Sequence, residues 1–203
     1  RLGLDHEDVE GIHNAVDYIA RIRQEDLNTL PVGREVIVIG GGNTAIDIAV
    51  QIKKLGAQHV TLVYRRGSEQ MGATWYEQDL AQTNGVVLET WAKPVAVEHD
   101  EAGVTGMVFE RTWLDENGRL QGTGDRFTLA ADMVFKAIGQ SFDSAVFAGD
   151  AGAEGLAIEQ GRIAVDAQGR TSLPQVYAGG DCSPGEDLTV AAVAQGRDAA
   201  EAI

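Results

Sequence analysis

The sequence is poor in cysteine and in basic residues, and it has no long apolar run; each shortage excludes a class of protein. The single cysteine, Cys182, rules out an internal disulfide, a C-x-x-C redox pair and an iron–sulfur cluster held by this chain alone. Lysine and arginine total 16 against 31 acidic residues, a net charge of −15, so we expect no nucleic-acid partner. Because no apolar stretch could cross a bilayer, we expect no membrane segment either. The four histidines are scattered without ligand spacing, which predicts no metal site.

The start of the chain also lacks two features. It opens on Arg1, with neither an initiator methionine nor a signal-peptide pattern. We therefore expect a cytoplasmic protein, of which this chain is a piece. At 203 residues, 44% of them hydrophobic, it can hold one large domain, or one domain and part of a second.

The most informative stretch is VIVIGGGNTAIDIA, residues 36–49. A β-branched apolar run typical of a buried parallel strand meets three glycines, and apolar residues then recur at helical spacing up to Gly56. Gly40, Gly42 and Ala45 fill the small positions of the G-x-G-x-x-G/A fingerprint, which a strand and a helix must flank. The glycines permit a tight turn and close approach of a pyrophosphate, and the helix N-terminus attracts its charge. The stretch predicts a dinucleotide site.

The next strand, predicted over residues 59–64, ends in Arg65 and Arg66. An acidic residue at the end of this strand usually binds the ribose 2′-hydroxyl of NADH. Here the strand end carries no carboxylate, and the first one after it is Glu69. Arginine offers planar, paired donors to phosphate oxygens, so the pair suits a 2′-phosphate. NADPH is therefore favoured over NADH. The alternative is a solvated basic pair at a strand end.

The rest of the chain shows conventional α/β patterning. One amphipathic helix, with Ile12 at its start, is expected before Pro31, and a loop before it. Further helices are expected at 75–83 and 188–203, an antiparallel meander at 94–129, and short strands at 86–91, 132–135, 162–165 and 176–178.

Several stretches resemble one family: GGGNTAIDIA, LVYRRGSEQM, FKAIGQ, VYAGGDCSPG and TVAAVAQGRDAAEAI. Together they are similar to the two-dinucleotide flavoprotein reductases, above all the small subunit of glutamate synthase and the electron-input module of dihydropyrimidine dehydrogenase. The likeness covers essentially the whole chain. In that family an inserted NADPH domain interrupts an FAD domain, and nothing here matches the first portion, which carries the FAD fingerprint.

The resemblance assigns roles to particular residues. It implies that the turn holds the NADPH pyrophosphate, that the two arginines hold its 2′-phosphate, and that a crossover leads back to the FAD domain. It also implies that a glycine–aspartate pair contacts the ribityl or phosphate groups of FAD, and that the N-terminus of a helix faces the flavin ring. The candidate residues, in that order, are Gly40, Gly41, Gly42, Asn43, Thr44 and Ala45; Arg65 and Arg66; Ala137, Ile138 and Gly139; Gly180 and Asp181; and Thr189, Val190 and Ala191.

The expected fold class is α/β: a Rossmann-like NAD(P)-binding domain of three-layer β/β/α character, with the C-terminal part of an FAD-binding domain. We expect residues 1–31 to be a linker helix on the FAD-domain side, 32–131 the NAD(P)H domain, and 132–203 the FAD-domain portion.

The expected function is an oxidoreductase that passes electrons from NADPH through FAD to a partner subunit or domain, for which an iron–sulfur protein is one candidate. No catalytic acid, base or nucleophile is expected, because the cofactors carry the reaction. A short-chain dehydrogenase is excluded, since no tyrosine has a lysine four residues later, and a thioredoxin reductase needs two close cysteines. A non-catalytic nucleotide-binding or redox-sensing module stays open.

Overall fold

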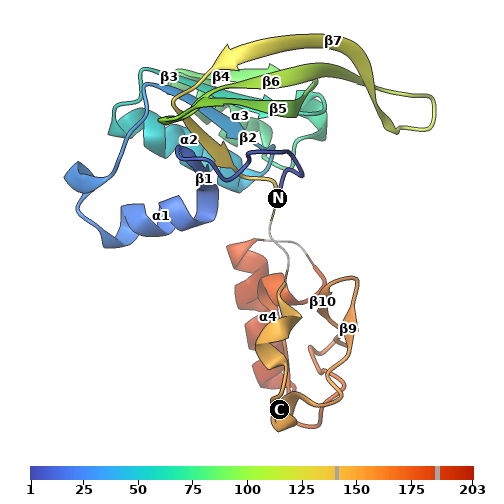
Figure 1. Ribbon diagram of the computed structural model, residues 1–203. Coiled ribbons are helices and arrows are strands. Elements are labelled where there is room, and N and C mark those ends of the chain that lie inside the picture. The colour runs from blue at the N-terminus through green and yellow to red at the C-terminus, as the bar shows by residue number, and fades with distance from the viewer. Residues whose placement is uncertain (140–141, 186–187) are drawn as a thin grey trace. The chain divides into compact units, whose positions relative to one another are not determined.

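A computed structural model describes residues 1–139, 142–185 and 188–203 of the chain (Figure 1). The contacts divide it into unit 1, Arg1–Gly139, and unit 2, Gln140–Ile203. Each unit is described by itself below.

The centre of unit 1 is a parallel sheet in the order β1-β8-β2-β3-β4. Its strands are β1 Ile12–Asn14, β2 Glu35–Ile39, β3 His59–Tyr64, β4 Val86–Thr90 and β8 Met133–Lys136. The chain runs outward from β2 through β3 to β4 and then returns to β8 on the other side of β2. The carboxyl ends of β2 and β8 therefore form a topological switch point, where open α/β sheets bind their ligands.

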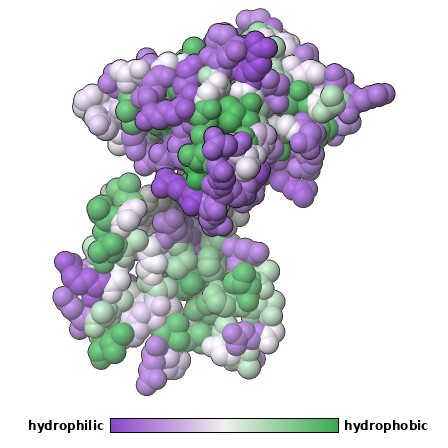
Figure 2. Space-filling model, turned by 90° about the vertical axis from the view of Figure 1, so that its left-hand side faces the viewer, coloured by the Kyte–Doolittle hydropathy of each residue, from purple (hydrophilic) through white to green (hydrophobic). Residues whose placement is uncertain are grey.

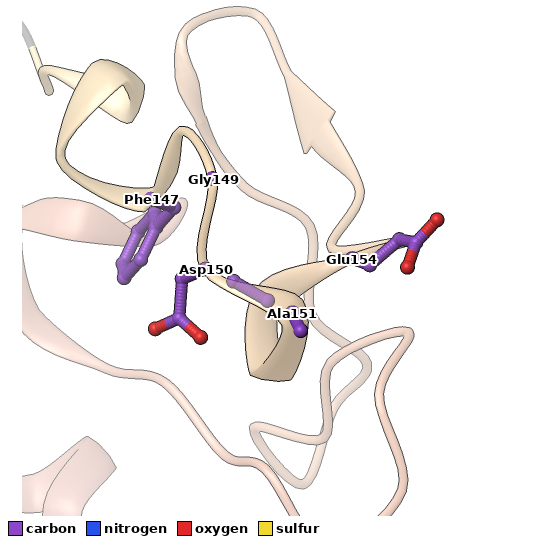
Figure 3. A pocket seen from close by; sticks show the side chains of 6 residues that line it. Phe147, Gly149, Asp150, Ala151 and Glu154 are labelled. Atoms are coloured by element: carbon purple, nitrogen blue, oxygen red, sulfur yellow. The ribbon is translucent and has the colours of Figure 1, made fainter.

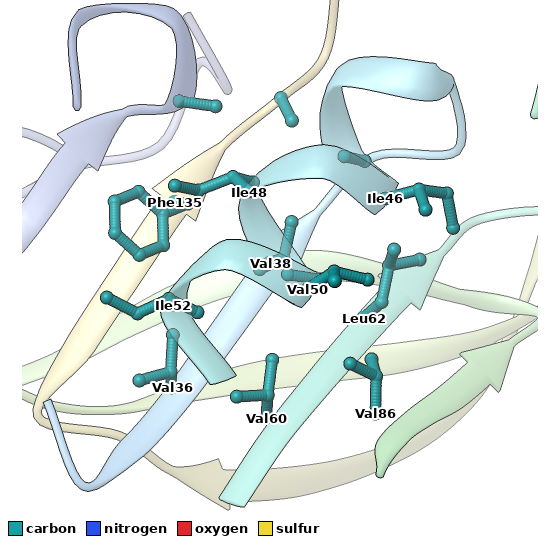
Figure 4. Packing of buried hydrophobic residues seen from close by; sticks show 14 of the residues in the cluster. Val36, Val38, Ile46, Ile48, Val50, Ile52, Val60, Leu62, Val86 and Phe135 are labelled. Carbon is teal, nitrogen blue, oxygen red and sulfur yellow. The ribbon is translucent and has the colours of Figure 1, made fainter. Parts of the chain in front are cut away.

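Three helices cover one face of this sheet: α1 Ala15–Gln24, α2 Asn43–Leu55 and α3 Trp75–Thr83. Side chains from alternate strand positions, such as Val36 and Val38, pack with Ile48 and Ile52 of α2 (Figure 4). Helix α2 ends as predicted at Gly56, whose φ of +120° suits only glycine. The predicted helix at 75–83 is confirmed residue for residue.

An antiparallel meander covers the other face: β5 Ala92–Asp100, β6 Gly103–Leu114 and β7 Leu120–Ala130. Ile37 and Ile39 of β2 pack there with Met107 and Phe109 of β6. The expected three-layer β/β/α arrangement is thus confirmed, because the residues of β2 alternate between two separate cores.

Unit 2 contains β9 Ile158–Glu159, β10 Arg162–Ile163 and helix α4 Thr189–Glu201. Short 3₁₀ turns occur in both units: Leu27–Thr29, Ser68–Gln70, Ser144–Phe147, Ala151–Ala153 and Gly180–Cys182. Among the described residues of unit 2, only Ile163 and Ser183 are buried. Figure 2 shows much apolar surface on unit 2, and it shows a mainly hydrophilic surface on unit 1. A unit with so little interior resembles part of a larger domain.

The structure corrects two expectations. Ile12, expected in a helix, lies in β1, and the helix begins at Ala15. The strand expected at 176–178 is a single bridge between Arg170 and Tyr177.

The contacts divide the chain at Gly139. Residues 1–31 lie in unit 1, where β1 pairs with β8, the start of the expected C-terminal portion, and the ring of Tyr18 packs edge-on against Phe135 with 4.9 Å between centroids. The division into an NAD(P)H-binding domain at 32–131 and an FAD-domain portion at 132–203 stays a prediction.

Within the described ranges, no helix combines the length and the apolar character that crossing a bilayer demands.

Candidate dinucleotide site

The first glycine of the turn is required by the fold itself. Gly40 has a φ of +152°, and its amide donates to the Val63 carbonyl at 3.1 Å. A Cβ at this position would lie 2.2 Å from the carbonyl oxygen of Ala137, which follows β8. Gly40 therefore allows the loops after β2 and β8 to approach each other at the switch point.

The other two glycines of the turn have different surroundings. A Cβ on Gly41 would lie 2.5 Å from the ring of Tyr64, so that ring occupies the space beside it. A Cβ on Gly42 would meet no atom within 4 Å. Because no described residue beyond its chain neighbours comes within 4 Å of that Cβ position, a ligand can approach the backbone there.

The N-terminus of α2 starts at this open side. Gly42 is its N-cap and offers no side-chain oxygen to the first turn. The first helical amides, of Asn43 and Thr44, have no acceptor among the described residues. The Oδ1 atom of Asn43 is buried and also has no hydrogen-bond partner in the described chain. Unsatisfied amides at the positive end of a helix dipole suit an anion such as a pyrophosphate.

Close packing of α2 on the sheet depends on the third small residue of the fingerprint. Ala45 is fully buried in the helix-side core. Further along α2, burial raises the pKa of the Asp47 carboxyl, and the Glu77 carboxylate raises it further.

Arg65 and Arg66 follow β3, the neighbour of β2, so they leave the sheet at the edge where the glycine turn lies. Arg65 is exposed and Arg66 half-buried, and neither guanidinium has an ion pair or hydrogen bond with any described residue. The backbone carbonyls of both arginines, in contrast, accept hydrogen bonds. The Arg65 carbonyl accepts from Thr112 Oγ1 at 2.8 Å, and the Arg66 carbonyl accepts from the Trp91 amide at 3.1 Å.

The loop between β3 and α3 folds back onto the glycine turn. The amide of Ala73 donates to the Gly41 carbonyl at 3.0 Å, and the Tyr64 hydroxyl donates to the Gln70 carbonyl at 2.8 Å. A capping box between Thr74 and Glu77 then starts α3. Tyr64 and Ala73 are not among the site residues predicted from the sequence. The spacing of Thr74 and Glu77 is the one local pattern that could have indicated a helix start beside the site.

The crossover residues also reach this edge. The Ala137 amide donates to the Ile39 carbonyl at 2.8 Å, the side chain of Ile138 is 45% exposed, and Gly139 has a φ of +100°. Unit 1 thus brings together the predicted turn, arginine and crossover residues.

The remaining predicted residues lie in unit 2. The amide of Gly180 donates to Gln195 Oε1 of α4 at 2.5 Å, which ties the Gly180–Cys182 turn to the helix. The Asp181 carboxylate is exposed and has no partner among the described residues. Thr189 begins α4 without a side-chain cap, because Leu188 precedes it.

The predicted helix start in unit 2 is open to solvent. Val190 is 75% exposed, and the α4 amides of Thr189, Val190 and Ala191 have no acceptor among the described residues. An open aspartate and a free helix N-terminus fit the ribityl and ring-edge groups of a flavin. They do not supply the glycine-turn cradle that grips a pyrophosphate.

Two hollows lie on unit 2. One, of about 400 Å³, is lined by residues between Phe147 and Glu154 (Figure 3). The other, of about 530 Å³, includes Gly179 and Cys182 among largely apolar residues, and neither hollow is lined by Asp181. Cys182 is half-buried, and its thiol donates to the Gly179 carbonyl at 3.3 Å. Within the described part of the chain, no cluster of three potential metal ligands occurs.

The fold and the glycine-turn site define a Rossmann-type dinucleotide-binding protein. A family model described as pyridine nucleotide-disulphide oxidoreductase matches residues 4–196, and the chain belongs to this family of oxidoreductases.

Curated relatives agree with this family. The chain is 35% identical to the β subunit of an NADP(+)-dependent formate dehydrogenase of Moorella thermoacetica, covering 100% of this chain and 29% of that protein. It is 32% identical to the small chain of glutamate synthase [NADPH] of Escherichia coli, over 100% of this chain and 47% of the relative. It is 34% identical to PreT, a subunit of NAD-dependent dihydropyrimidine dehydrogenase of the same organism, over 98% of this chain and 42% of the relative. The resemblance seen in the sequence motifs is confirmed, and the chain spans between 29% and 47% of these relatives' length.

Among solved structures, thioredoxin reductase of T. acidophilum has a TM-score of 0.75 at 21% identity and covers 99% of this chain and 60% of that chain. This likeness confirms the predicted α/β fold class.

Proposed function

We propose that this chain is the NADPH-binding part, with a portion of the flavin-binding part, of an oxidoreductase that passes electrons from NADPH through FAD to a partner. The observation that carries the proposal is the open helix N-terminus at Gly42 beside two arginines whose guanidiniums have no partner in the described structure. Membership of the pyridine nucleotide oxidoreductase family supports it.

Each part of the site has a role in this proposal. The amides of Asn43 and Thr44 hold the pyrophosphate, and Arg65 and Arg66 hold the 2′-phosphate. When bound, NADPH would supply a hydride, that is two electrons and one proton, for transfer to FAD. The chain's own residues bind and orient the cofactors. In unit 2, the Asp181 carboxylate accepts hydrogen bonds from flavin hydroxyls.

Two further residue groups complete the assignment. Ala137, Ile138 and Gly139 carry the chain from the nucleotide sheet toward the flavin portion. The N-terminus of α4, at Thr189, Val190 and Ala191, stabilises negative charge on the reduced flavin ring.

The acceptor of the electrons is proposed to be a separate subunit or domain, and an iron–sulfur protein fits a carrier of electrons from a flavin. Two of the relatives are named subunits, and a third is named a small chain. We propose the cytoplasm as its location, because this chain uses no disulfide that an oxidising compartment would favour. A non-catalytic module is not favoured, since those relatives are named as parts of synthases and dehydrogenases.

The test is a double variant, Arg65→Gln/Arg66→Gln. Each lost hydrogen bond between charged groups weakens binding by about 1.5–3 kcal/mol, so the affinity for NADPH should fall a hundredfold or more. The affinity for NADH, which has no 2′-phosphate, should stay within about twofold. Isothermal titration calorimetry with both nucleotides measures this.

The control is Arg119→Gln/Arg126→Gln, two exposed arginines of the β6–β7 hairpin, which changes the net charge by the same amount. It should leave both affinities unchanged. Equal losses for NADPH and NADH in the first variant, or none, would mean that Arg65 and Arg66 are a solvated strand end.

A further inference from the structure

Thr112 of β6 and Trp91, which lies between β4 and β5, hold the loop of the two arginines at three points. Thr112 Oγ1 donates to the Arg65 carbonyl at 2.8 Å, and the Trp91 amide donates to the Arg66 carbonyl at 3.1 Å. A Cβ on Gly67 would lie 2.9 Å from the Trp91 ring, so this ring packs directly against the residue after the arginines. Three successive backbone positions are therefore fixed from outside their own loop.

Thr112 and Trp91 also hold each other. The amide of Thr112 donates to the Trp91 carbonyl at 2.9 Å. Trp91 has a φ of +58°, a conformation that is strained for a bulky residue and persists only where surrounding contacts impose it. Thr112 is only 6% exposed, so its hydroxyl lies inside unit 1. The strained residue Trp91 and the buried hydroxyl of Thr112 thus both contact the loop that carries the arginines.

The ladder between β6 and β7 is irregular beside Thr112. Between Glu110 and Thr112 the partner on β7 changes from Arg126 to Gly122, so the extra residues of this irregularity lie on β7 and only Arg111 lies between the two pairs on β6. Arg111 pairs with Glu89 of β4 and lies over the ring of Phe127, with 4.2 Å to its centroid. The residue before Thr112 therefore anchors this part of β6 to the central sheet and to β7.

We propose that Thr112, with Trp91, is a positioning residue for cofactor choice: it sets the backbone from which Arg65 and Arg66 reach the 2′-phosphate. This inference rests on the proposed role of the two arginines. Without the hydroxyl, the Arg65 carbonyl loses its partner, the loop shifts, and the guanidiniums no longer converge on one phosphate. Because Thr112 fixes only the arginine loop, its loss should affect NADPH and not NADH.

The test compares Thr112→Val, which keeps the shape of the side chain and removes the hydroxyl, with Thr112→Ser, which keeps the hydroxyl. Thr112→Val should weaken NADPH binding about fivefold, the equivalent of one hydrogen bond, and leave NADH unchanged. Thr112→Ser should retain the wild-type preference. Titration calorimetry with each nucleotide gives the ratio of the two affinities. If Thr112→Val does not fold, Thr112→Ala removes the same hydroxyl without added bulk.

A double-mutant cycle separates this proposal from a purely structural role. In the Arg65→Gln/Arg66→Gln background, Thr112→Val should cause no further change in the NADPH-to-NADH ratio. The inference would be overturned if Thr112→Val left the NADPH-to-NADH affinity ratio of the wild-type background unchanged, as when both nucleotides lose affinity equally. It would also be overturned if Thr112→Val reduced the NADPH affinity by the same factor in both backgrounds. Either result would leave the arginine assignment intact. If Arg65→Gln/Arg66→Gln itself does not alter the ratio, the proposed function of the arginines fails, and this inference fails with it.

Discussion

Two glycines of one turn should respond in opposite ways to the same substitution. Gly42→Ala places a methyl group where no described residue beyond its chain neighbours lies within 4 Å, in a backbone with a φ of −99° that alanine adopts freely. The free energy of unfolding should change by less than about 1 kcal/mol. Gly40→Ala places the same methyl 2.2 Å from the Ala137 carbonyl oxygen, at a φ of +152°.

The expected magnitudes follow from these contacts. Gly40→Ala adds overpacking of about 1–3 kcal/mol and backbone strain of about 1–3 kcal/mol, so it should destabilise unit 1 by about 2–6 kcal/mol. In Gly42→Ala the methyl pushes the pyrophosphate away from the first amides of α2. Loss of even one such bond to a charged oxygen, about 1.5–3 kcal/mol, weakens NADPH binding about 10- to 150-fold.

The assay uses two measurements on each variant. All three tryptophans, Trp75, Trp91 and Trp113, lie in unit 1, so urea unfolding followed by tryptophan fluorescence reports on unit 1 alone. Titration calorimetry gives the NADPH affinity. A Gly42→Ala protein that binds NADPH like the wild type would refute the placement of the pyrophosphate. A Gly40→Ala protein of wild-type stability would refute the account of the switch point.

Two further predictions concern unit 2 and the meander. The 203-residue chain should bind NADPH but purify without bound flavin, because the described part of unit 2 buries only Ile163 and Ser183 and offers no glycine-turn cradle. Absorbance at flavin wavelengths after gel filtration measures the bound flavin. About one FAD per chain would contradict the prediction. In the β6–β7 turn, the Arg119 amide, the Gln121 side chain and the Asn117 amide hold the pKa of Asp115 below its usual 3.8. The ionised Asp115 carboxylate therefore stabilises the folded state above pH 3.8, and this stabilisation is lost as the pH falls through the lower folded-state pKa. Asp115→Ala should lower the urea midpoint of unfolding at pH 7. The difference in urea midpoint between this variant and the wild type should become smaller toward pH 3. Asp125→Ala, an exposed residue of β7, is the control and should match the wild type at both pH values.

Local pattern determined much of this protein. The apolar run before three glycines, the helical spacing after them and Gly56 were enough to place β2, the turn and α2, because each signal lies within a few residues of the structure that it specifies. The same holds for α3, whose capping residues Thr74 and Glu77 are three apart, and for the meander, whose turns carry their own glycines. The positions of Arg65 and Arg66 at the end of β3 followed from this local pattern.

Only the tertiary structure decided what these elements contact. Three residues cannot form a strand alone, and Ile12–Asn14 becomes β1 because β8, more than a hundred residues later, offers it a parallel partner; this pairing moves the N-terminal segment into unit 1. The space in front of Gly42, the carbonyl of Ala137 against Gly40, and the hydroxyl of Thr112 on the arginine loop are likewise contacts between distant segments. Periodicity cannot reveal such contacts, because it reports which face of an element is buried and not which atom lies opposite it.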